Sequence, residues 1–394
     1  MKFSYLDNSA TTPVCGAAYQ KMKDVLENTF GNPSSLHTLG MEAEKTLSEA
    51  REKIFTAMGS KKYGKVKPQM LVFTASGTEA NNLALIGTAT AKERRKGGKI
   101  IVGETEHPSV IETAKYLASR GFKVAFIPSP KGVWDMEKYR AELTNDTILV
   151  SAMLVNNETG AVNDIAAIAS LAIAKNPDVV IHCDAVQGFL KLPEPLASLP
   201  ADLITVSSHK IGGPKGAGAL FVREKILTAK GLVPVVHGGG QESGMRSGTE
   251  NTAGIAGFGA AAEYEHKNLS ASLERFAALR ALAEQLIKEK APDVRVNTPA
   301  GRYAPHIISL TLPGIRSETM LHFLSSRGVF VSSGSACASN TGHRSHVLAS
   351  YGMSDKEVDS TIRVSLGVQN TEEDIHNLVN ALAEGISSLS RRTK

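Results

Sequence analysis

The sequence predicts an α/β fold, with a mainly parallel seven-stranded sheet in a large domain and a smaller α+β domain. Short apolar runs alternate with stretches in which apolar residues recur every three or four positions, a pattern typical of a parallel sheet covered by helices. The chain has 394 residues, of which 42% are hydrophobic and 21% are charged. This length favours about two domains, and the composition excludes disordered and collagen-like proteins.

The candidate strands follow one another through the first part of the chain. They are expected in the runs QMLVFT, KIIVGET, KVAFIP, TILVSAMLV, VVIHCDA, DLITVSS and GALFV. Helical spacing appears between them, at Glu79 to Lys96, Ser109 to Arg120 and Ile165 to Lys175. Because ligands of such open sheets bind outside the carboxyl ends of the strands, the residues after each strand are the candidates for a functional site.

We expect the large domain to span residues 16–260 and the small domain to combine residues 1–15 with 261–394. The boundary rests on the helical stretch AAAEYEHKNLSASLERFAALRALAEQLIKEK, which is typical of a helix that connects two domains. The sequence contains no internal repeat and no low-complexity segment.

Charge and hydropathy exclude other classes of protein. The formal net charge of +5 is spread along the chain, and its densest clusters, KERRK and KK, are typical of solvated loops and helix ends, so no nucleic-acid groove is expected. No run approaches the roughly 18 apolar residues of a membrane span, and the start MKFSYLDNSATTP has no apolar signal-peptide core. We therefore expect no membrane contact and a cytoplasmic location.

The three cysteines, Cys15, Cys183 and Cys337, are widely spaced and do not have the spacing of a zinc site. Neither a disulfide nor a metal is therefore expected. Cys183 lies in the apolar run VVIHCDAV, where a small buried hydrophobic residue is expected. Cys337 lies in SSGSACASNTGHRSH, whose small and polar residues are typical of an exposed, mobile loop. An exposed thiol in such a loop indicates a chemical role.

Polar clusters follow five of the predicted strands. The first opens a helix with a small-residue turn, whose free N–H groups suit a phosphate, with an ordinary helix cap as the alternative. A capping histidine, a simple Asn-Gly turn and a solvated lysine are the corresponding alternatives at later clusters. The clusters are Gly77 with Thr78, His107, the NNETG stretch with Asn157, Asp184 with Gln187, and Ser207 with His209 and Lys210.

These residue types fit one cofactor, pyridoxal phosphate. It requires a lysine for its Schiff base, an acid opposite the ring nitrogen, an anion site for the phosphate and usually a flat group against the ring. A carboxylate opposite the ring nitrogen keeps that nitrogen protonated, and Gln187 is placed to bind the ring hydroxyl. The four requirements are met, in the order given, by Lys210, Asp184, Gly77 with Thr78, and His107.

The sequence also resembles the class V aminotransferase family of fold-type I pyridoxal-phosphate enzymes and, within it, the group I cysteine desulfurases (NifS/IscS-like). The resemblance extends from Tyr5 to about Leu389, and its blocks occur in the family's order and approximate spacing. The matching blocks are YLDNSATTP, GNPSSLH, FTASGTEANN, TEHPSV, VNNETG, HCDAVQ, SSHKIGGPKG, GGGQESGMRSGTEN, SSGSACAS and TIRVSLG.

The resemblance implies a role for each site residue. Lys210 is the Schiff-base lysine and also moves the substrate Cα proton. Arg363 clamps the α-carboxylate of L-cysteine with help from Asn157, because a planar guanidinium suits a carboxylate; a surface arginine is the alternative. The phosphate cradle implied by the family consists of Gly77, Thr78, Ser207 and His209, with Thr249 contributed by the partner subunit of a homodimer that shares its active sites.

The resemblance gives Cys337 its role. In group I members, this cysteine attacks the sulfur of the bound substrate and leaves as a persulfide, while alanine is released and the sulfur passes to an acceptor protein such as an iron–sulfur scaffold. Only the thiolate is a good nucleophile. His107 is the expected acid/base group for the substrate thiol. Three neighbours of Cys337 are candidates to assist it, namely His343, Arg344 and His346.

Two stretches depart from the housekeeping members of the family. These are NTGHRSHVL after the cysteine block and the ending SSLSRRTK, and they bear on the identity of the acceptor partner rather than on catalysis.

Three functions are compared: a cysteine desulfurase, a selenocysteine lyase or related lyase or aminotransferase, and a non-catalytic assembly protein. The presence of Lys210, Asp184, His107 and Arg363 argues against the third, and Cys337 in the SSGSAC context favours the first over the second.

Overall fold

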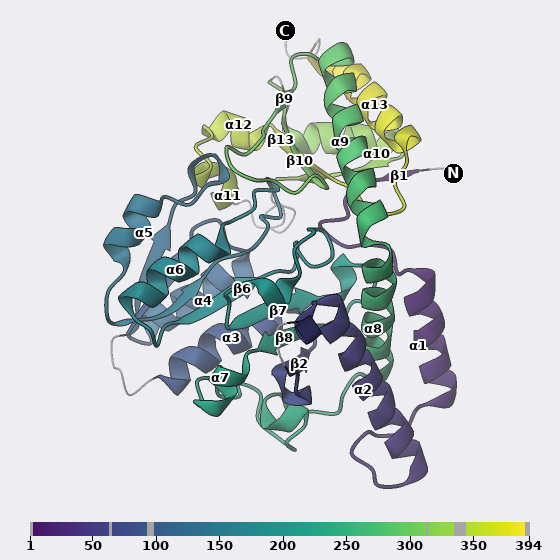
Figure 1. Ribbon diagram of the computed structural model, residues 1–394. Coiled ribbons are helices and arrows are strands. Elements are labelled where there is room, and N and C mark those ends of the chain that lie inside the picture. Colours follow the sequence, from purple (N-terminus) through teal and green to yellow (C-terminus); the bar gives the residue numbers. More distant parts are fainter. Residues whose placement is uncertain (1–2, 63–64, 93–97, 313, 335–343, 391–394) are drawn as a thin grey trace.

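The larger sheet has seven strands in the order β2-β8-β7-β6-β5-β3-β4. The computed structural model describes residues 3–62, 65–92, 98–312, 314–334 and 344–390 (Figure 1). The prediction of a mainly parallel seven-stranded sheet is confirmed, because only β8 runs against its neighbours. The strands are β2 (Leu71–Thr74), β3 (Lys99–Gly103), β4 (Lys123–Ile127), β5 (Thr147–Ser151), β6 (Val180–Asp184), β7 (Leu203–Ser207) and β8 (Gly218–Val222).

The direction of the strands gathers several strand ends at one edge. Strand β8 is antiparallel to both β2 and β7, so β2 and β7 run the same way. Strands β3, β5 and β6 are parallel to β7 through successive pairs. The carboxyl ends of these five strands therefore lie along one edge of the sheet, where ligands bind in folds of this kind.

Helices cover both faces of this sheet. Successive residues of a strand point to opposite faces, so Ile100 and Ile101 belong to two different apolar clusters. Both faces are buried, which is why the strands read as nearly continuous apolar runs. The helices of this part are α1 (Gly16–Asn28), α2 (Thr38–Ala57), α3 (Gly77–Ala91), α4 (Pro108–Ser119), α5 (Met136–Glu142), α6 (Ile165–Lys175), α7 (Glu224–Thr228) and α8 (Thr252–Lys267).

A third apolar cluster joins both ends of the chain. It packs Leu6 with residues between Phe276 and Leu382 around an antiparallel sheet of order β12-β13-β10-β9. The amino-terminal strand β1 (Ser4–Tyr5) pairs in parallel with β11 (Val329–Phe330). The other elements are α9 (Leu269–Lys290), β9 (Arg295–Val296), β10 (Ile307–Thr311), α10 (Ser317–Ser326), β12 (Ser332–Ser333), α11 (His346–Ser350), α12 (Asp355–Asp359), β13 (Thr361–Ser365) and α13 (Glu372–Ser390). The exact domain ranges given above stay a prediction.

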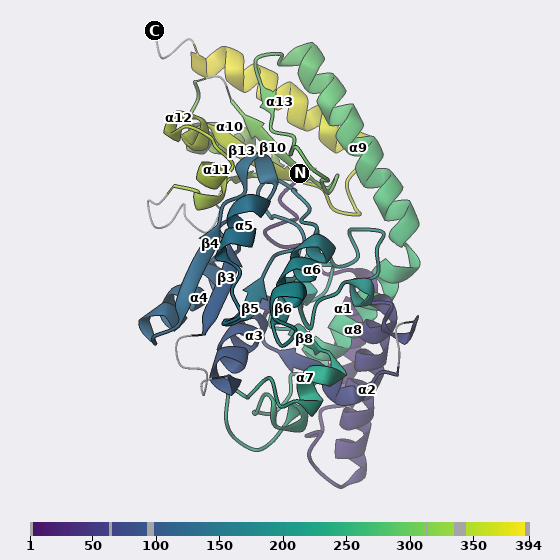
Figure 2. The ribbon, with the colours of Figure 1, turned by 60° about the vertical axis from the view of Figure 1, so that its left-hand side comes forward.

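The long helical stretch expected near residue 260 is two helices that meet at Asn268. Helix α8 packs on α1 and α2, whereas α9 packs on α13, as both views show (Figures 1 and 2). The chain thus passes from one core to the other at Asn268, whose side-chain Nδ2 donates to the carbonyl oxygen of Tyr264 at 2.8 Å. In the described part of the chain, no helix is both long and apolar enough to cross a membrane.

Candidate active site

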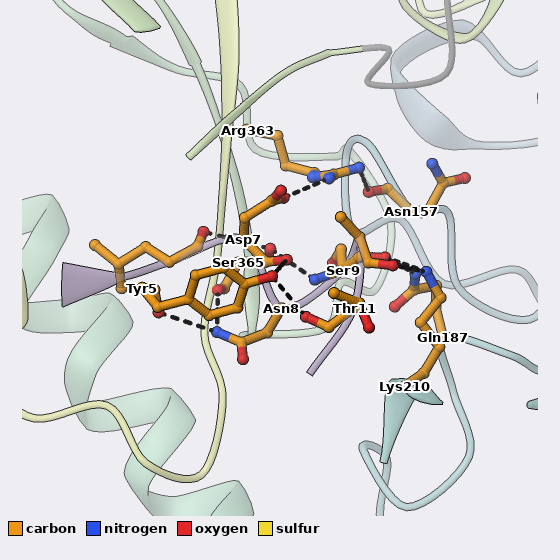
Figure 3. Close-up of polar contacts among 12 residues, drawn as sticks. Tyr5, Asp7, Asn8, Ser9, Thr11, Asn157, Gln187, Lys210, Arg363 and Ser365 are labelled. Carbon is orange, nitrogen blue, oxygen red and sulfur yellow. Dashed lines mark hydrogen bonds and ion pairs between the residues drawn. The ribbon is translucent and has the colours of Figure 1, made fainter. Parts of the chain in front are cut away.

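An amino-terminal loop crosses the carboxyl edge of the large sheet and contacts Lys210. Lys210 lies in a 3-10 turn that follows β7. Its Nζ donates to the carbonyl oxygens of Ser9 at 2.5 Å and Ala10 at 2.7 Å (Figure 3). Gln187 Nε2 donates to the same Ser9 oxygen at 2.9 Å. Lys210 and Gln187, which were predicted to contact one cofactor, therefore meet at Ser9.

This loop is held from both sheets. Ser9 N–H donates to Ser365 Oγ of β13 at 2.8 Å, and Asn8 Nδ2 donates to the Ser365 carbonyl oxygen at 2.9 Å. On the other side, Thr12 N–H donates to the carbonyl oxygen of His209 at 2.9 Å. The carbonyl groups that position Lys210 are thus fixed between the small sheet and the turn after β7.

Asp184 is a buried carboxylate at the end of β6, with 4% of its surface exposed. Its Oδ2 accepts from Asn81 Nδ2 at 2.8 Å, and its Oδ1 accepts from the Val186 N–H at 3.0 Å. Both donors are neutral, so they orient the carboxylate without cancelling its charge. This arrangement suits the predicted role opposite a protonated ring nitrogen.

His107 caps the first turn of α4 and lies near both other predicted groups. Its Nδ1 accepts from the Ser109 N–H at 3.1 Å and lies 2.8 Å from Ser109 Oγ. Burial lowers the pKa of His107; the negative charge of Asp184 opposes this, and the positive charge of Lys210 adds to it. His107 is therefore a neutral imidazole within electrostatic reach of Asp184 and Lys210.

The predicted phosphate cradle begins at the amino terminus of α3. A Cβ on Gly77 would lie 3.0 Å from Val186 Cγ2 and 3.4 Å from Ser207 Cβ, so glycine lets this backbone approach the ends of β6 and β7 without displacing either side chain. Ser207 is buried and Thr78 is exposed. Burial and the nearby charge of Lys210 lower the pKa of His209 to about 4. His209 is therefore neutral and lies 3.2 Å from Thr11 Oγ1 through its Nδ1, while the N–H groups at the start of the 15-residue helix α3 suit an anion.

Arg363 is buried on β13, with 3% of its surface exposed, so the alternative of a surface arginine is wrong. Its Nη2 donates to Asp7 Oδ1 at 2.8 Å, and its Nη1 donates to the main-chain carbonyl oxygen of Asn157 at 3.1 Å (Figure 3). Arg363 thus contacts the backbone of Asn157, and the predicted joint binding of a carboxylate by the two residues stays a prediction. Arg363 Nε is buried and has no hydrogen-bond partner within the described residues.

The loop that carries Cys337 lies outside the described residues, as does His343, but residues on both sides of it meet at Glu158. Ser345 Oγ donates to Glu158 Oε2 at 2.6 Å, and a Cβ on Gly334 would lie 3.4 Å from the same oxygen. Burial raises the pKa of Glu158 to about 7. The Glu158 carboxyl thus contacts one end of the segment and lies beside the other.

Three further site candidates are described by the structure. Arg344 and His346 follow the segment directly, and Thr249 lies elsewhere in the chain. Arg344 forms ion pairs with Asp355 and Asp359, the latter at 3.3 Å, and so is engaged with α12. His346 Nε2 lies 3.0 Å from the Glu106 carbonyl oxygen, next to His107. Thr249 is exposed in the loop before α8, and its contribution to a partner subunit stays a prediction.

The sequence reasoning missed five residues that orient the predicted ones. All five lie in blocks that were singled out as wholes without these residues being separated from them, Asp7 and Ser9 in the block YLDNSATTP. The signal for the others is a polar residue on a helix face or turn that is otherwise apolar, such as asparagine in the first turns of α3. The five are Asp7, Ser9, Asn81, Ser109 and Glu158.

The residues present fit pyridoxal phosphate. Several buried side-chain oxygens at this edge lack a hydrogen-bond partner among the described residues, including Ser9 Oγ, Gln187 Oε1 and Ser207 Oγ. Leaving one buried polar group unpaired costs about 1–3 kcal/mol, so such a cluster indicates a polar ligand. A phosphate and a ring hydroxyl supply the donors and acceptors that these oxygens need.

Comparisons with known proteins find relatives over almost the whole chain. Residues 4–378 match the model of the family described as aminotransferase class-V. A protein named cysteine desulfurase IscS from Dictyoglomus turgidum is 37% identical over 98% of this chain and 95% of its own length. One of the same name from Escherichia coli is 39% identical over 98% and 93%.

Solved structures agree with the sequence comparison. A structure described as a NifS-like protein superposes with a TM-score of 0.89 at 34% identity, covering 98% of this chain and 100% of its own. The structure of a NifS-like protein from Rickettsia africae gives a TM-score of 0.85 at 30% identity, with coverage of 98% and 100%. The likeness therefore includes both sheets and the edge where the candidate residues gather.

Proposed function

Because the chain belongs to the aminotransferase class-V family, we propose that it is a cysteine desulfurase, which removes the sulfur of L-cysteine and releases L-alanine. The relatives that carry this name support the proposal over nearly their whole length. The observation that carries it is the meeting of His107, Asp184 and Lys210 at one edge of the large sheet, since these groups bind and use pyridoxal phosphate.

In this proposal, each residue of the edge holds one part of the cofactor. Lys210 would bind it covalently, Asp184 would hold its ring nitrogen, Gln187 its hydroxyl group, and His107 would contact its ring. When bound, pyridoxal phosphate withdraws electrons from the carbon atoms of the substrate. The phosphate is assigned to Gly77, Thr78, Ser207 and His209, with Thr249 from the partner subunit.

Arg363 and His107 act on the substrate itself. The Nε edge of Arg363 binds the α-carboxylate, for which a buried guanidinium offers a planar pair of N–H donors, and Asn157 assists. The neutral imidazole of His107 takes the proton of the substrate thiol. The amine of Lys210 would move the proton at the substrate Cα.

Cys337 then receives the sulfur. Its thiolate forms a sulfur–sulfur bond with the substrate, the carbon–sulfur bond breaks, and its electron pair stays with Cβ, which takes a proton to give alanine. The enzyme is left with a persulfide on Cys337. The sulfur atoms lose two electrons in this step, and the substrate Cβ gains the same two electrons. We assign the persulfide to transfer onto an acceptor protein, such as an iron–sulfur scaffold, in the cytoplasm.

A homodimer is part of the proposal. The turn between α1 and α2 lies at the lower end of the molecule in Figure 1, and exposed apolar side chains lie on it and on the first turn of α2. Phe30, Leu36 and Met41 are 73%, 95% and 64% exposed in the single chain. Because exposed apolar clusters of this kind mark interaction surfaces, a second copy of the chain is proposed to cover this turn and to receive Thr249.

The test is to supply L-cysteine and a thiol reductant and to measure sulfide and alanine together. The proposal predicts equal amounts of both, and loss of both in Cys337→Ser, whereas the matched variant Cys15→Ser retains them. Alanine and sulfide made at the wild-type rate by Cys337→Ser would instead indicate a direct lyase. Neither product from the wild-type protein in the presence of pyridoxal phosphate would refute the proposed function.

A further inference from the structure

A buried chain of hydrogen bonds joins His107 to Asp184. Asn81 Nδ2 donates to Asp184 Oδ2 at 2.8 Å and to Ser109 Oγ at 2.8 Å. Ser109 Oγ in turn lies 2.8 Å from His107 Nδ1. The two linking residues come from the first turns of α3 and α4, and they are 1% and 8% exposed. Water therefore does not compete for these contacts.

The donors in this chain can be assigned one by one. An amide nitrogen carries two hydrogens, and those of Asn81 are used by Asp184 and Ser109. Because Ser109 Oγ accepts one of them, its own hydrogen is available for His107 Nδ1. The Ser109 N–H also points at Nδ1, at 3.1 Å, and an N–H can only donate. His107 Nδ1 is therefore an acceptor from two directions.

We propose that Asn81 and Ser109 are positioning residues that hold the proton of neutral His107 on Nε2 and tie its ring to Asp184. Protonation of Nδ1 would set its hydrogen against that of the Ser109 N–H. His107 thus exchanges protons at Nε2 alone. The inference deepens the proposed function and rests on it for the identity of the group that meets Nε2, whereas the tautomer follows from the hydrogen bonds within the chain.

Charged groups also act on this imidazole through space, and this action does not pass through the Ser109 hydroxyl. Asp184 of β6 favours the protonated ring, and Lys210 of the turn after β7 and His346 of α11 disfavour it. Removing the Ser109 hydroxyl leaves these three in place. It removes one donor to the neutral form of His107, so the ring should protonate more easily.

The adjacent pair offers a matched control. Thr113 Oγ1 lies 3.0 Å from Asn82 Oδ1 of α3 and 2.8 Å from the main-chain carbonyl oxygen of Ser109. Thr113 is also buried, at 5% exposed. Thr113→Val therefore removes a buried hydroxyl between the same two helices but keeps the Ser109 hydroxyl and its contact with His107 Nδ1.

The experiment is nitrogen-15 NMR of the cofactor-bound protein with labelled histidine, in which the His107 signals are assigned by their loss in His107→Gln. The wild-type protein should show neutral His107 with its proton on Nε2. Ser109→Ala should raise the titration midpoint of His107 by about one pH unit, the equivalent of one hydrogen bond. Ser109→Thr, which keeps a hydroxyl, and Thr113→Val should leave the midpoint within a few tenths of a unit.

The outcomes separate this inference from the proposed function. A proton on Nδ1 in the wild-type spectrum, or equal midpoints in Ser109→Ala and Thr113→Val, would overturn it. The wild-type spectrum tests the tautomer even if Ser109→Ala does not fold. Because none of these spectra requires turnover of L-cysteine, an inactive protein with the expected tautomer would contradict the proposed function and leave the hydrogen-bond chain supported.

Discussion

Asp7 and Arg363, 356 residues apart in the chain, form a 2.8 Å ion pair between the amino-terminal loop and β13. The pair is buried on the arginine side and leaves the guanidinium Nε without a partner in the part of the chain that the structure describes. Asp7 therefore fixes the plane of the guanidinium while one of its edges stays available to a carboxylate. This relationship makes the proposed clamp testable.

Replacing Arg363 by lysine should weaken substrate binding more than chemistry. A lysine ammonium is a point charge and does not reproduce the planar pair of donors, so we expect the KM for L-cysteine to rise by at least about tenfold, the equivalent of about 1.4 kcal/mol. Cofactor absorbance should be unchanged. The matched variant is Arg280→Lys, at a buried arginine that contacts Glu284 and the Ile307 carbonyl oxygen. An equal rise of KM in both variants would contradict the assignment.

Lys210 should be the residue that binds the cofactor covalently. Borohydride reduction of the yellow protein, followed by peptide mapping, should place the cofactor on Lys210. Lys210→Ala should lose the visible absorbance of the covalent form, and Lys215→Ala should keep it because Lys215 is exposed. Label on Lys215, or unchanged absorbance in Lys210→Ala, would reject the assignment.

Glu158 should make the stability of the protein pH-dependent. Burial raises its pKa from 4.5 to about 7, so the folded state binds the proton more tightly than the unfolded state does. The contribution of this proton to the free energy of unfolding is fully present below about pH 4.5 and is lost as the pH rises through 7. The loss amounts to about 3 kcal/mol. Glu158→Gln stays neutral, so its free energy of unfolding relative to wild type should increase by about that amount from pH 4 to pH 8.

Chemical denaturation at several pH values measures this difference. Glu137→Gln, at an exposed position on α5, serves as the control and should keep a constant difference from wild type over the same range. If the difference between Glu158→Gln and wild type does not change with pH, the pKa of Glu158 is the same in the folded and unfolded protein, and burial does not raise it.

The apolar turn between α1 and α2 should control the assembly state. Leu36→Glu puts a charge on the most exposed of its apolar side chains, at 95%, and should shift a dimer to monomers in light scattering at micromolar concentration. Activity should fall with the dimer, since Thr249 is assigned to the partner's phosphate site. Tyr116→Glu, at a half-exposed position on α4, should change neither. A wild-type protein that is monomeric and active would contradict this surface assignment.

The large sheet and the central residues of the site could be predicted from the sequence, because both depend on local patterns. Its seven strands are buried on both faces and therefore appear as apolar runs, and Asp184 and Lys210 follow strand ends directly. Asp7 and Asn81 were not separated from their surroundings, because their roles depend on contacts with residues 356 and 103 positions away. The break at Asn268 was also missed, since apolar spacing continues across it and only the change of packing partner reveals it.

The most direct test of the account is the fate of the sulfur when L-cysteine is added without a reductant. Mass spectrometry of the wild-type protein should show one added sulfur on the peptide that carries Cys337, removable by an acceptor thiol, with one alanine released per persulfide formed. Cys183 should remain unmodified, because it is fully buried and burial raises the pKa of its thiol. Added sulfur on Cys15 or Cys183, or alanine formed without any persulfide on Cys337, would contradict the account.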